Sequence, residues 1–379
     1  MKDHSLEVHG CHTYDATGAI SPSICLSATF RHPRFGESTG YDYGRVANPT
    51  RESLEKTVAL LERGGRSWAL SSGMAAVQLV FSLLSAGDHV LMSEDLYGGT
   101  VRLAEEVFAS YGITFEYVDV RDLALVGKCM RSETKLVFIE TPSNPMMQIA
   151  DIAALSALAH ENGALRAVDN TFLSPHFQKP LTLGADLVLH SGTKYLCGHN
   201  DVIAGFLVLK DATSAQAKRI ELLAKSAGPN LSALDSWLML RSIKTLGVRV
   251  ERQAENALAI ARWLGTLPEV TEVLYPGLAD HPGYALQQKQ ASGAGGMISF
   301  KVRSAEIAKA ALGRLHLIAF AESLGGVETL LTYPIAQTHA EMPAALLKRT
   351  GLDDKLLRLS VGIEDAEDLK ADLQQALQG

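Results

Sequence analysis

A lysine that follows a short apolar run is the residue in this sequence best suited to chemistry. Residues 187–189 are expected to form a buried strand, and Ser191, Thr193 and Lys194 follow within five positions. In open α/β sheets, ligands bind at the carboxyl ends of strands. Apolar neighbours disfavour the charged form of a lysine there, so that its amine can form a Schiff base with a carbonyl compound. These residue types are equally compatible with a surface lysine after a strand.

An aspartate at the end of a second candidate strand indicates which carbonyl compound the lysine would hold. Residues 165–168 form this strand, and Asp169 follows it directly. If Asp169 lies near Lys194, it can pair with the protonated pyridine nitrogen of pyridoxal phosphate. That cofactor needs such a partner to act as an electron sink.

Short segments along the whole chain carry a resemblance to a known family. They are YDYGRVANPT from 41, SSGMAA from 71, ETPSNP from 140, VDNTF from 168, SGTKY from 191, ESLGGVE from 322 and LRLSVGIED from 357. In type and order they resemble the Cys/Met-metabolism family of pyridoxal-phosphate enzymes. That family contains cystathionine γ-synthase, cystathionine γ- and β-lyases, O-acylhomoserine sulfhydrylases and methionine γ-lyase. The segments are specific for the family and much less specific for the reaction.

Composition and charge exclude several other classes of protein. The chain has 379 residues, of which 47% are hydrophobic, and a formal net charge of −7. This length can bury large cores and suggests two domains. The negative charge and the scattered basic residues give no reason to expect nucleic acid or an anionic membrane as a partner. No apolar stretch approaches the length of a membrane span.

The N-terminal segment and the cysteines predict a cytoplasmic protein. The first residues include acids and lack the apolar core of a secretion signal. Four widely spaced cysteines are typical of free thiols in a reducing compartment: Cys11, Cys25, Cys129 and Cys197. His9, Cys11 and His12 are close in sequence, but no second pair follows at zinc spacing, so we expect no metal site.

The order of apolar and helical segments predicts an α/β fold. Residues 51–240 alternate short apolar runs with helical segments, as in a mainly parallel sheet covered by helices. The candidate strands are 68–70, 90–92, 115–118, 136–139, 165–168, 187–189 and 206–209. Residues 241–379 suggest a smaller α+β domain that begins with a long helix and ends with an amphipathic helix at 364–379. Residues 1–50 are rich in Gly, Ser, Pro and Thr and suggest an arm that packs on something else. The resemblance implies a fold-type I enzyme with these three parts.

A cofactor phosphate would have a suitable place at the start of one helix. Gly73 and Met74 follow the candidate strand 68–70 and open a helix, an arrangement that points amides at an anion. The glycine permits close approach of the backbone. The alternative is that a serine side chain simply caps this helix without any ligand, although a serine cap and a bound phosphate can occur together. The resemblance implies that Ser191 and Thr193 also bind the phosphate.

Other cofactor contacts rest on the resemblance. It implies that Tyr43 and Arg45, in the arm, reach across a subunit interface to the neighbour's cofactor phosphate, which a guanidinium and a phenol suit. The alternative is a surface turn. Tyr97 would stack on the pyridine ring and assist proton transfer, although a tyrosine beside glycines is also a common loop anchor. Asn144 would lie near the ring hydroxyl, or would simply belong to a proline-shaped turn.

A substrate amino acid would be held mainly by an arginine near the C-terminus. Arg358 lies in an apolar stretch, where a charge without a partner is costly, so it needs an anion. The resemblance implies the α-carboxylate of the substrate, with Ser323 adding a hydrogen bond, whereas an internal salt bridge is the alternative. Arg102 and Glu322 match family positions that suit a substrate with a charged far end.

The resemblance leaves the reaction partly open. We expect carbon–sulfur bond cleavage of cystathionine-like substrates by β- or γ-elimination, with Lys194 and Tyr97 as catalytic residues. The alternative is γ-replacement on an O-acylhomoserine, and methionine γ-lyase, an aminotransferase and a non-catalytic homologue are more distant ones. A homotetramer built from dimers that share active sites is also implied.

Overall fold

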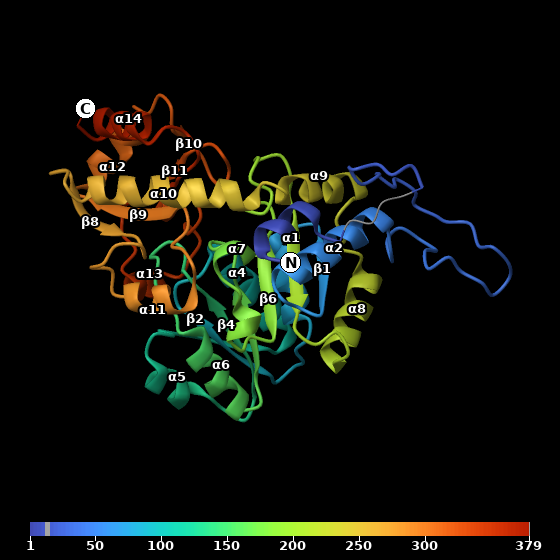
Figure 1. The fold of residues 1–379 in the computed structure, drawn as a ribbon. Helices are drawn as coiled ribbons and strands as arrows, with labels where there is room; N and C mark the ends of the chain where they lie inside the picture. Colours follow the sequence, from blue (N-terminus) through green and yellow to red (C-terminus); the bar gives the residue numbers. More distant parts are fainter. Residues whose placement is uncertain (12–15, 379) are drawn as a thin grey trace.

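Two β-sheets and the helix between them form the framework of the protein (Figure 1). The computed structural model describes residues 1–11 and 16–378, so His12 lies outside the described residues. The larger sheet has seven strands in the order β1-β7-β6-β5-β4-β2-β3, and the smaller has five in the order β10-β11-β12-β9-β8. The helix α10 (Leu246–Leu264) extends from the body around the larger sheet to the smaller one.

The seven-stranded sheet is mainly parallel. Strands β2 to β6 run parallel to one another, whereas β7 is antiparallel to both β1 and β6. The bounds are β1 Arg66–Leu70, β2 His89–Ser93, β3 Thr114–Val118, β4 Thr134–Glu140, β5 Leu165–Asp169, β6 Leu187–Ser191 and β7 Gly205–Leu209. Alternate residues of β4 enter two separate cores, Val137 and Ile139 in one and Leu136 and Phe138 in the other. Because both faces are buried, the strands read as nearly continuous apolar runs.

Helices cover both faces of this sheet. On one face pack α2 and α6, and on the other α3 and α8, with apolar side chains from each helix in the respective core. The helices in this part are α2 Pro49–Leu61, α3 Gly73–Phe81, α4 Gly98–Arg102, α5 Leu123–Cys129, α6 Ile152–Glu161, α7 Ser174–Phe177, α8 Ala215–Ala227 and α9 Ala233–Ile243. The predicted α/β class with a mainly parallel sheet is confirmed.

The five-stranded sheet belongs to a smaller C-terminal part with its own core. Its strands are β8 Val270–Leu274, β9 Met297–Val302, β10 Ala319–Phe320, β11 Leu330–Thr332 and β12 Leu356–Ser360. Its helices are α11 Tyr284–Gln290, α12 Ala305–Leu312, α13 Ala344–Thr350 and α14 Ala366–Gln378. The predicted terminal helix is present as α14, and its apolar side chains, such as Leu369 and Leu373, are buried in this core. Neither β11 nor β12 was predicted, because β11 is short and Arg358 interrupts the apolar pattern of β12.

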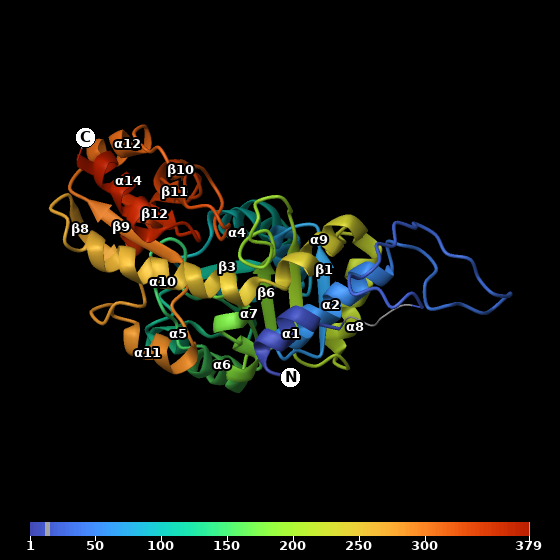
Figure 2. The same ribbon diagram turned by 45° about the horizontal axis from the view of Figure 1, so that its top comes forward.

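The N-terminal region consists of a short helix and a long extension. The helix α1 (Asp3–His9), which was not predicted, packs against α2 and α10. Part of the chain between residues 16 and 48 projects from the rest of the subunit in both views (Figures 1 and 2), whereas other parts of it contact the body, as where the Trp237 indole donates to the carbonyl of Pro22. It exposes large apolar side chains, among them Ile20, Leu26 and Phe35. Such exposure indicates a segment that packs on something outside this chain. The division into the three parts given above stays a prediction.

Candidate active site

Lys194 lies just beyond the carboxyl end of β6, near the middle of the larger sheet. The side chain is partly buried, and its Nζ donates a hydrogen bond to Ser323 Oγ at 2.6 Å. Burial and the positive charge of Arg358 lower the pKa of Lys194 from 10.5 to about 8, against the opposing effect of Glu322. A larger share of this amine is therefore neutral near pH 7 than for an ordinary lysine, and a neutral amine is a nucleophile.

The loop that carries Ser323 fits closely against the backbone around Lys194. Ser323 and Gly325 both have left-handed backbone conformations, with φ of +83° and +79°. A Cβ atom at Gly325 would lie 2.7 Å from the amide nitrogen of Tyr195, so only glycine fits there. The Val327 amide also donates to the carbonyl of Gly198 at 2.9 Å. A non-glycine residue at positive φ, such as Ser323, is a common feature of functional sites.

Asp169 ends β5, the strand next to β6. Its Oδ1 accepts hydrogen bonds from the Thr171 hydroxyl at 2.5 Å and from the Thr171 amide at 3.0 Å. The same Thr171 hydroxyl accepts from the amide of Ser191 at 2.9 Å, which ties Asp169 to the lysine loop. Burial raises the pKa of Asp169, although the bonds from Thr171 and the charge of His190 oppose this. A cation placed beside the carboxylate, such as a protonated pyridine nitrogen, would therefore be favoured.

The start of α3 forms a candidate phosphate site. Ser72 caps the helix by accepting a hydrogen bond from the Ala75 amide at 3.1 Å. The amides of Gly73 and Met74 lie in the first turn, where N–H groups have no partner within the helix. A Cβ atom at Gly73 would lie 2.8 Å from Cβ of Ser191, so Ser191 borders this turn directly. The serine cap and the anion-binding amides therefore occur together.

Thr193 and Tyr97 lie near the first turn of α3. The Thr193 hydroxyl exchanges hydrogen bonds with the backbone of Ala204, donating to its carbonyl at 3.2 Å and accepting from its amide at 3.0 Å. A Cβ atom at Gly99 would lie 2.5 Å from Cε1 of Tyr97 and 3.2 Å from Sδ of Met74. The half-exposed phenol ring of Tyr97 is therefore close to Met74, in the first turn of α3.

Arg358 is buried without an acidic partner. Its side chain, on β12, is only 1% exposed. Its Nη1 donates to Asn144 Oδ1 at 2.8 Å, and Nη2 donates to the carbonyl of Ser323 at 3.1 Å and to Thr332 Oγ1 at 3.2 Å. Its Nε has no hydrogen-bond partner among the described residues. The alternative of an internal salt bridge does not occur among them either, so a carboxylate from a ligand would satisfy the guanidinium.

The remaining predicted residues lie farther out. Arg102 is exposed and forms an ion pair with Glu341, and Glu322 is exposed next to Ser323. Tyr43 and Arg45 lie on the N-terminal extension, with the Arg45 guanidinium 5.5 Å from the Tyr43 ring. Arg45 donates to the carbonyl of Lys225, in the last turn of α8, so within this chain neither residue meets Lys194.

Four polar residues of the site were not singled out from the sequence. Besides Thr171 and Thr332, they are Glu140 and His339, both buried. Glu140 accepts from the Tyr97 amide at 2.9 Å, and burial together with the charge of Asp169 raises its pKa well above the usual range. His339 donates from Nε2 to the Asn144 carbonyl at 3.0 Å, and burial lowers its pKa to about 4, so it is neutral. Glu140 and Thr171 each carried a signal, because both lie at the end of a strand in a matching segment.

These residues fit one class of cofactor. A partly buried lysine amine, a carboxylate on the neighbouring strand and a helix start bordered by hydroxyl groups are the contacts that pyridoxal phosphate requires. The fold and the site together are those of a pyridoxal-phosphate-dependent enzyme.

Comparison with known proteins gives the family. Residues 4–378 match the model of the family described as Cys/Met metabolism PLP-dependent enzyme, and the chain belongs to this family. It is 46% identical to the cystathionine gamma-lyase of Bacillus subtilis (strain 168) over 379 residues, which is 100% of both chains. It is also 46% identical to a cystathionine beta-lyase of that strain over 365 residues, 96% of this chain and 93% of the relative.

A solved structure adds a third activity among the similar proteins. The cystathionine gamma synthase from Xanthomonas oryzae pv. oryzae, in complex with aminoacrylate and cysteine, superposes with a TM-score of 0.95 at 42% identity. The match covers 100% of this chain and 98% of that one. The predicted family, the fold type, the enzymatic nature and the cofactor are therefore confirmed. The roles of the individual residues stay predictions.

The lowered pKa of Lys194 predicts how cofactor binding depends on pH. Only the neutral amine attacks an aldehyde, so the rate at which cofactor-free protein takes up pyridoxal phosphate should rise with pH around a midpoint near 8 rather than 10.5. Glu322→Gln removes a negative charge that stabilises the protonated amine and should move this midpoint to lower pH. Stopped-flow absorbance over a pH series measures both.

Glu328→Gln, an exposed acid on the same segment, is the matched control and should leave the midpoint unchanged. A midpoint near the ordinary lysine value, or an upward shift with Glu322→Gln, would contradict the electrostatic account of Lys194.

Proposed function

We propose that this enzyme cleaves a carbon–sulfur bond of cystathionine-like amino acids. One observation carries the proposal: Arg358 is buried, lacks an acidic partner among the described residues, and donates to the backbone of Ser323, whose hydroxyl accepts from Lys194. A substrate α-carboxylate bound to Arg358 would bring Cα of an amino acid close to the lysine amine. The similar proteins named for cystathionine lyases and synthases support cystathionine as the substrate class.

Residues of three segments would hold the cofactor. Asp169 would pair with the ring nitrogen, Asn144 would lie near the ring hydroxyl, and Tyr97 would stack on the ring. The phosphate group would be held by a set of residues at the start of α3 and in the lysine loop, namely Gly73, Met74, Ser191 and Thr193. When bound through Lys194, pyridoxal phosphate supplies an electron sink for the negative charge that develops at Cα of the substrate.

The side chains of the site have separate roles in the rest of the reaction. Lys194, once displaced by the substrate, removes the proton from Cα and can return it elsewhere, which suits an amine whose pKa is about 8. Arg358 and Ser323 hold the α-carboxylate and so decide which bond of Cα faces the amine. Tyr97, half-exposed at the rim, assists proton transfer to the departing group. Arg102 and Glu322 would face the charged far end of the substrate.

The second candidate is γ-replacement on an O-acylhomoserine. It is favoured by the likeness to a cystathionine gamma synthase over the full chain, at an identity only slightly below that to the lyases. Methionine γ-lyase is less well supported. The chain has Arg102, which those enzymes typically lack, and it has Gly99 where they typically have cysteine. A non-catalytic homologue would be expected to lose Lys194 or Asp169, and both are present.

The proposal also covers the oligomeric state of the enzyme and its location in the cell. Part of the extension that carries Tyr43 and Arg45 projects from the subunit, and neither residue meets Lys194 within this chain, which supports a dimer in which each arm completes the neighbour's phosphate site, and a tetramer of two such dimers (Figure 2). We assign the enzyme to the cytoplasm, in line with four cysteines that are all free thiols. Within the part of the chain that the structure describes, no helix is long and apolar enough to cross a bilayer.

The products from a panel of substrates test the reaction. Cystathionine should give either pyruvate, for cleavage at Cβ, or 2-oxobutyrate, for cleavage at Cγ, and a coupled dehydrogenase assay followed by chromatography separates the two. Lys194→Ala should abolish both, because it removes the base as well as the cofactor link.

O-Acetyl- and O-succinylhomoserine, each with cysteine, form the comparison. If the enzyme makes cystathionine from these substrates faster than it releases either keto acid from cystathionine, the enzyme is a synthase and the lyase assignment is wrong. An absence of product from every substrate, with cofactor bound, would favour the non-catalytic alternative.

Subunit mixing tests whether Arg45 acts on the neighbour's site. Lys194→Ala and Arg45→Ala should each be nearly inactive alone. In mixed dimers, one site would have an intact lysine from one chain and an intact arginine from the other. Random reassembly of equal amounts should therefore recover about a quarter of the wild-type activity in a symmetric dimer.

If Arg45 serves the site of its own chain, every mixed dimer lacks one of the two residues at each site, and no activity returns. Mixing Lys194→Ala with Asp169→Ala, two residues of one chain's site, is the matched control and should stay inactive.

A further inference from the structure

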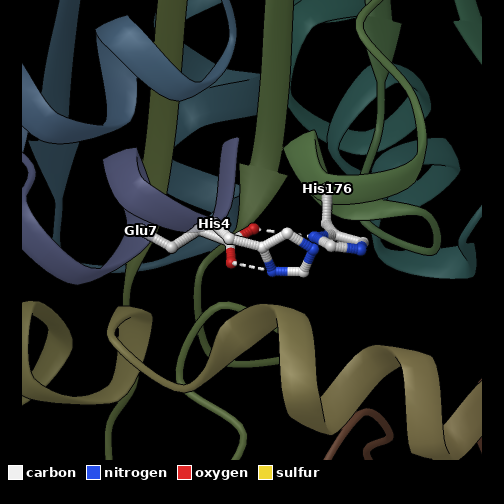
Figure 3. A group of neighbouring side chains, drawn as sticks. All are labelled: His4, Glu7 and His176. Carbon is white, nitrogen blue, oxygen red and sulfur yellow. Dashed lines mark hydrogen bonds and ion pairs between the residues drawn. The ribbon is translucent and has the colours of Figure 1, made fainter. Parts of the chain in front are cut away.

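A second cluster of ionisable side chains lies on the surface formed by α1, α7 and α10. His4 and Glu7 come from α1 and His176 from α7, and each offers a ligand atom within 4.8 Å of the others (Figure 3). Glu251, on α10, faces both histidines. The cluster takes no part in the proposed reaction, and three distant segments of the chain converge on it.

The spacing around Glu251 suits a shared metal ion better than direct bonds. Oε1 of Glu251 is 3.4 Å from Nε2 of His4 and 3.4 Å from Nε2 of His176. These separations exceed the usual range for an N–H···O hydrogen bond. Ligand atoms held at about 2.1 Å from a tetrahedral zinc ion lie about 3.4 Å from one another. Each imidazole nitrogen therefore has, relative to the carboxylate oxygen of Glu251, the spacing of two ligands around one ion.

Glu7 holds one of these imidazoles in the orientation that a metal needs. The Glu7 side chain is 3% exposed. Its Oε1 accepts a hydrogen bond from Nδ1 of His176 at 2.7 Å, and its Oε2 accepts from the Gly247 amide at 3.1 Å. In the tautomer that donates from Nδ1, the Nε2 atom of His176 is the one available to a metal, and it lies 3.4 Å from Oε1 of Glu251. A carboxylate that accepts from the second nitrogen of a ligating histidine is a regular feature of metal sites.

We propose that His4, His176 and Glu251 bind a divalent transition-metal ion, for which Zn²⁺ is best suited, with Glu7 as the residue that orients His176. Imidazole and carboxylate ligands in this number suit Zn²⁺, with water completing the coordination. The His4 and Glu251 side chains are 61% and 46% exposed, so an ion can enter from solvent. Such an ion would fasten α1 to α7 and to α10, the helix that leads to the C-terminal part.

Sequence patterns alone could not predict this site. The ligands are separated by 172 and 75 positions (176 − 4 and 251 − 176), so no short spacing marks them. The expectation of no metal site rested on the absence of such a spacing around His9.

Binding of Co²⁺ to tag-free holoenzyme tests the proposal. Tetrahedral Co²⁺ has visible bands at longer wavelength than the bound cofactor, and Zn²⁺ should displace it. We expect one saturable Co²⁺ per subunit, with affinity at least about tenfold weaker in His4→Ala and in Glu251→Gln. Glu7→Gln should weaken the affinity for Co²⁺ about 10–100-fold, although the three ligands His4, His176 and Glu251 remain. Zn²⁺ should also raise the thermal midpoint of the wild type and not of His4→Ala.

His9→Ala, one turn further along α1, is the matched control and should bind Co²⁺ like the wild type. Because His4 and Glu251 are both exposed, their variants should fold, which circular dichroism checks. The proposal is overturned by the absence of a saturable Co²⁺ band, by equal affinity in His4→Ala and the wild type, or by a loss confined to His9→Ala.

Discussion

The hydrogen bond from Lys194 to Ser323 joins the two parts of the subunit at the site of chemistry. The lysine follows a strand of the large sheet, and the serine lies on a loop that leads into the small sheet. Gly325 fits closely against the Lys194–Tyr195 peptide, and the lysine side chain beside it is partly buried. That burial is the main cause of its lowered pKa. The reactivity of the lysine therefore depends on the packing of the C-terminal part against the large sheet.

Several ionisable groups around this contact form no ion pair within the described chain. Arg358 has amide, carbonyl and hydroxyl oxygens as partners, and burial lowers its pKa to about 10. Burial likewise raises the pKa of Asp169 and of Glu140. Groups of this kind cost stability until a ligand of opposite charge arrives. A cofactor with a cationic ring nitrogen and a substrate with a carboxylate would supply those charges, so binding and folding would be coupled.

Sequence reasoning found the residues whose types have unusual chemistry and missed those that position them. The seven strands of the large sheet were predicted, since a strand buried on both faces is a continuous apolar run that turn residues bound. Lys194 and Asp169 stood out because each ends such a run. Thr171, Thr332 and His339 did not, because hydroxyl and neutral imidazole groups are common on surfaces, and the partners of Thr332 and His339 are distant in sequence. The helix α1 and the ligands of the proposed metal site depend in the same way on tertiary contacts.

The central claim is that the Lys194 amine is the point where the cofactor is attached. Reduction of the holoenzyme with borohydride makes an imine between lysine and aldehyde permanent, and peptide mass spectrometry then locates it. We predict a pyridoxyl-phosphate mass increment on Lys194 and on no other lysine, with loss of activity in step with labelling. An increment on a different lysine, or full activity after complete labelling of Lys194, would contradict the account.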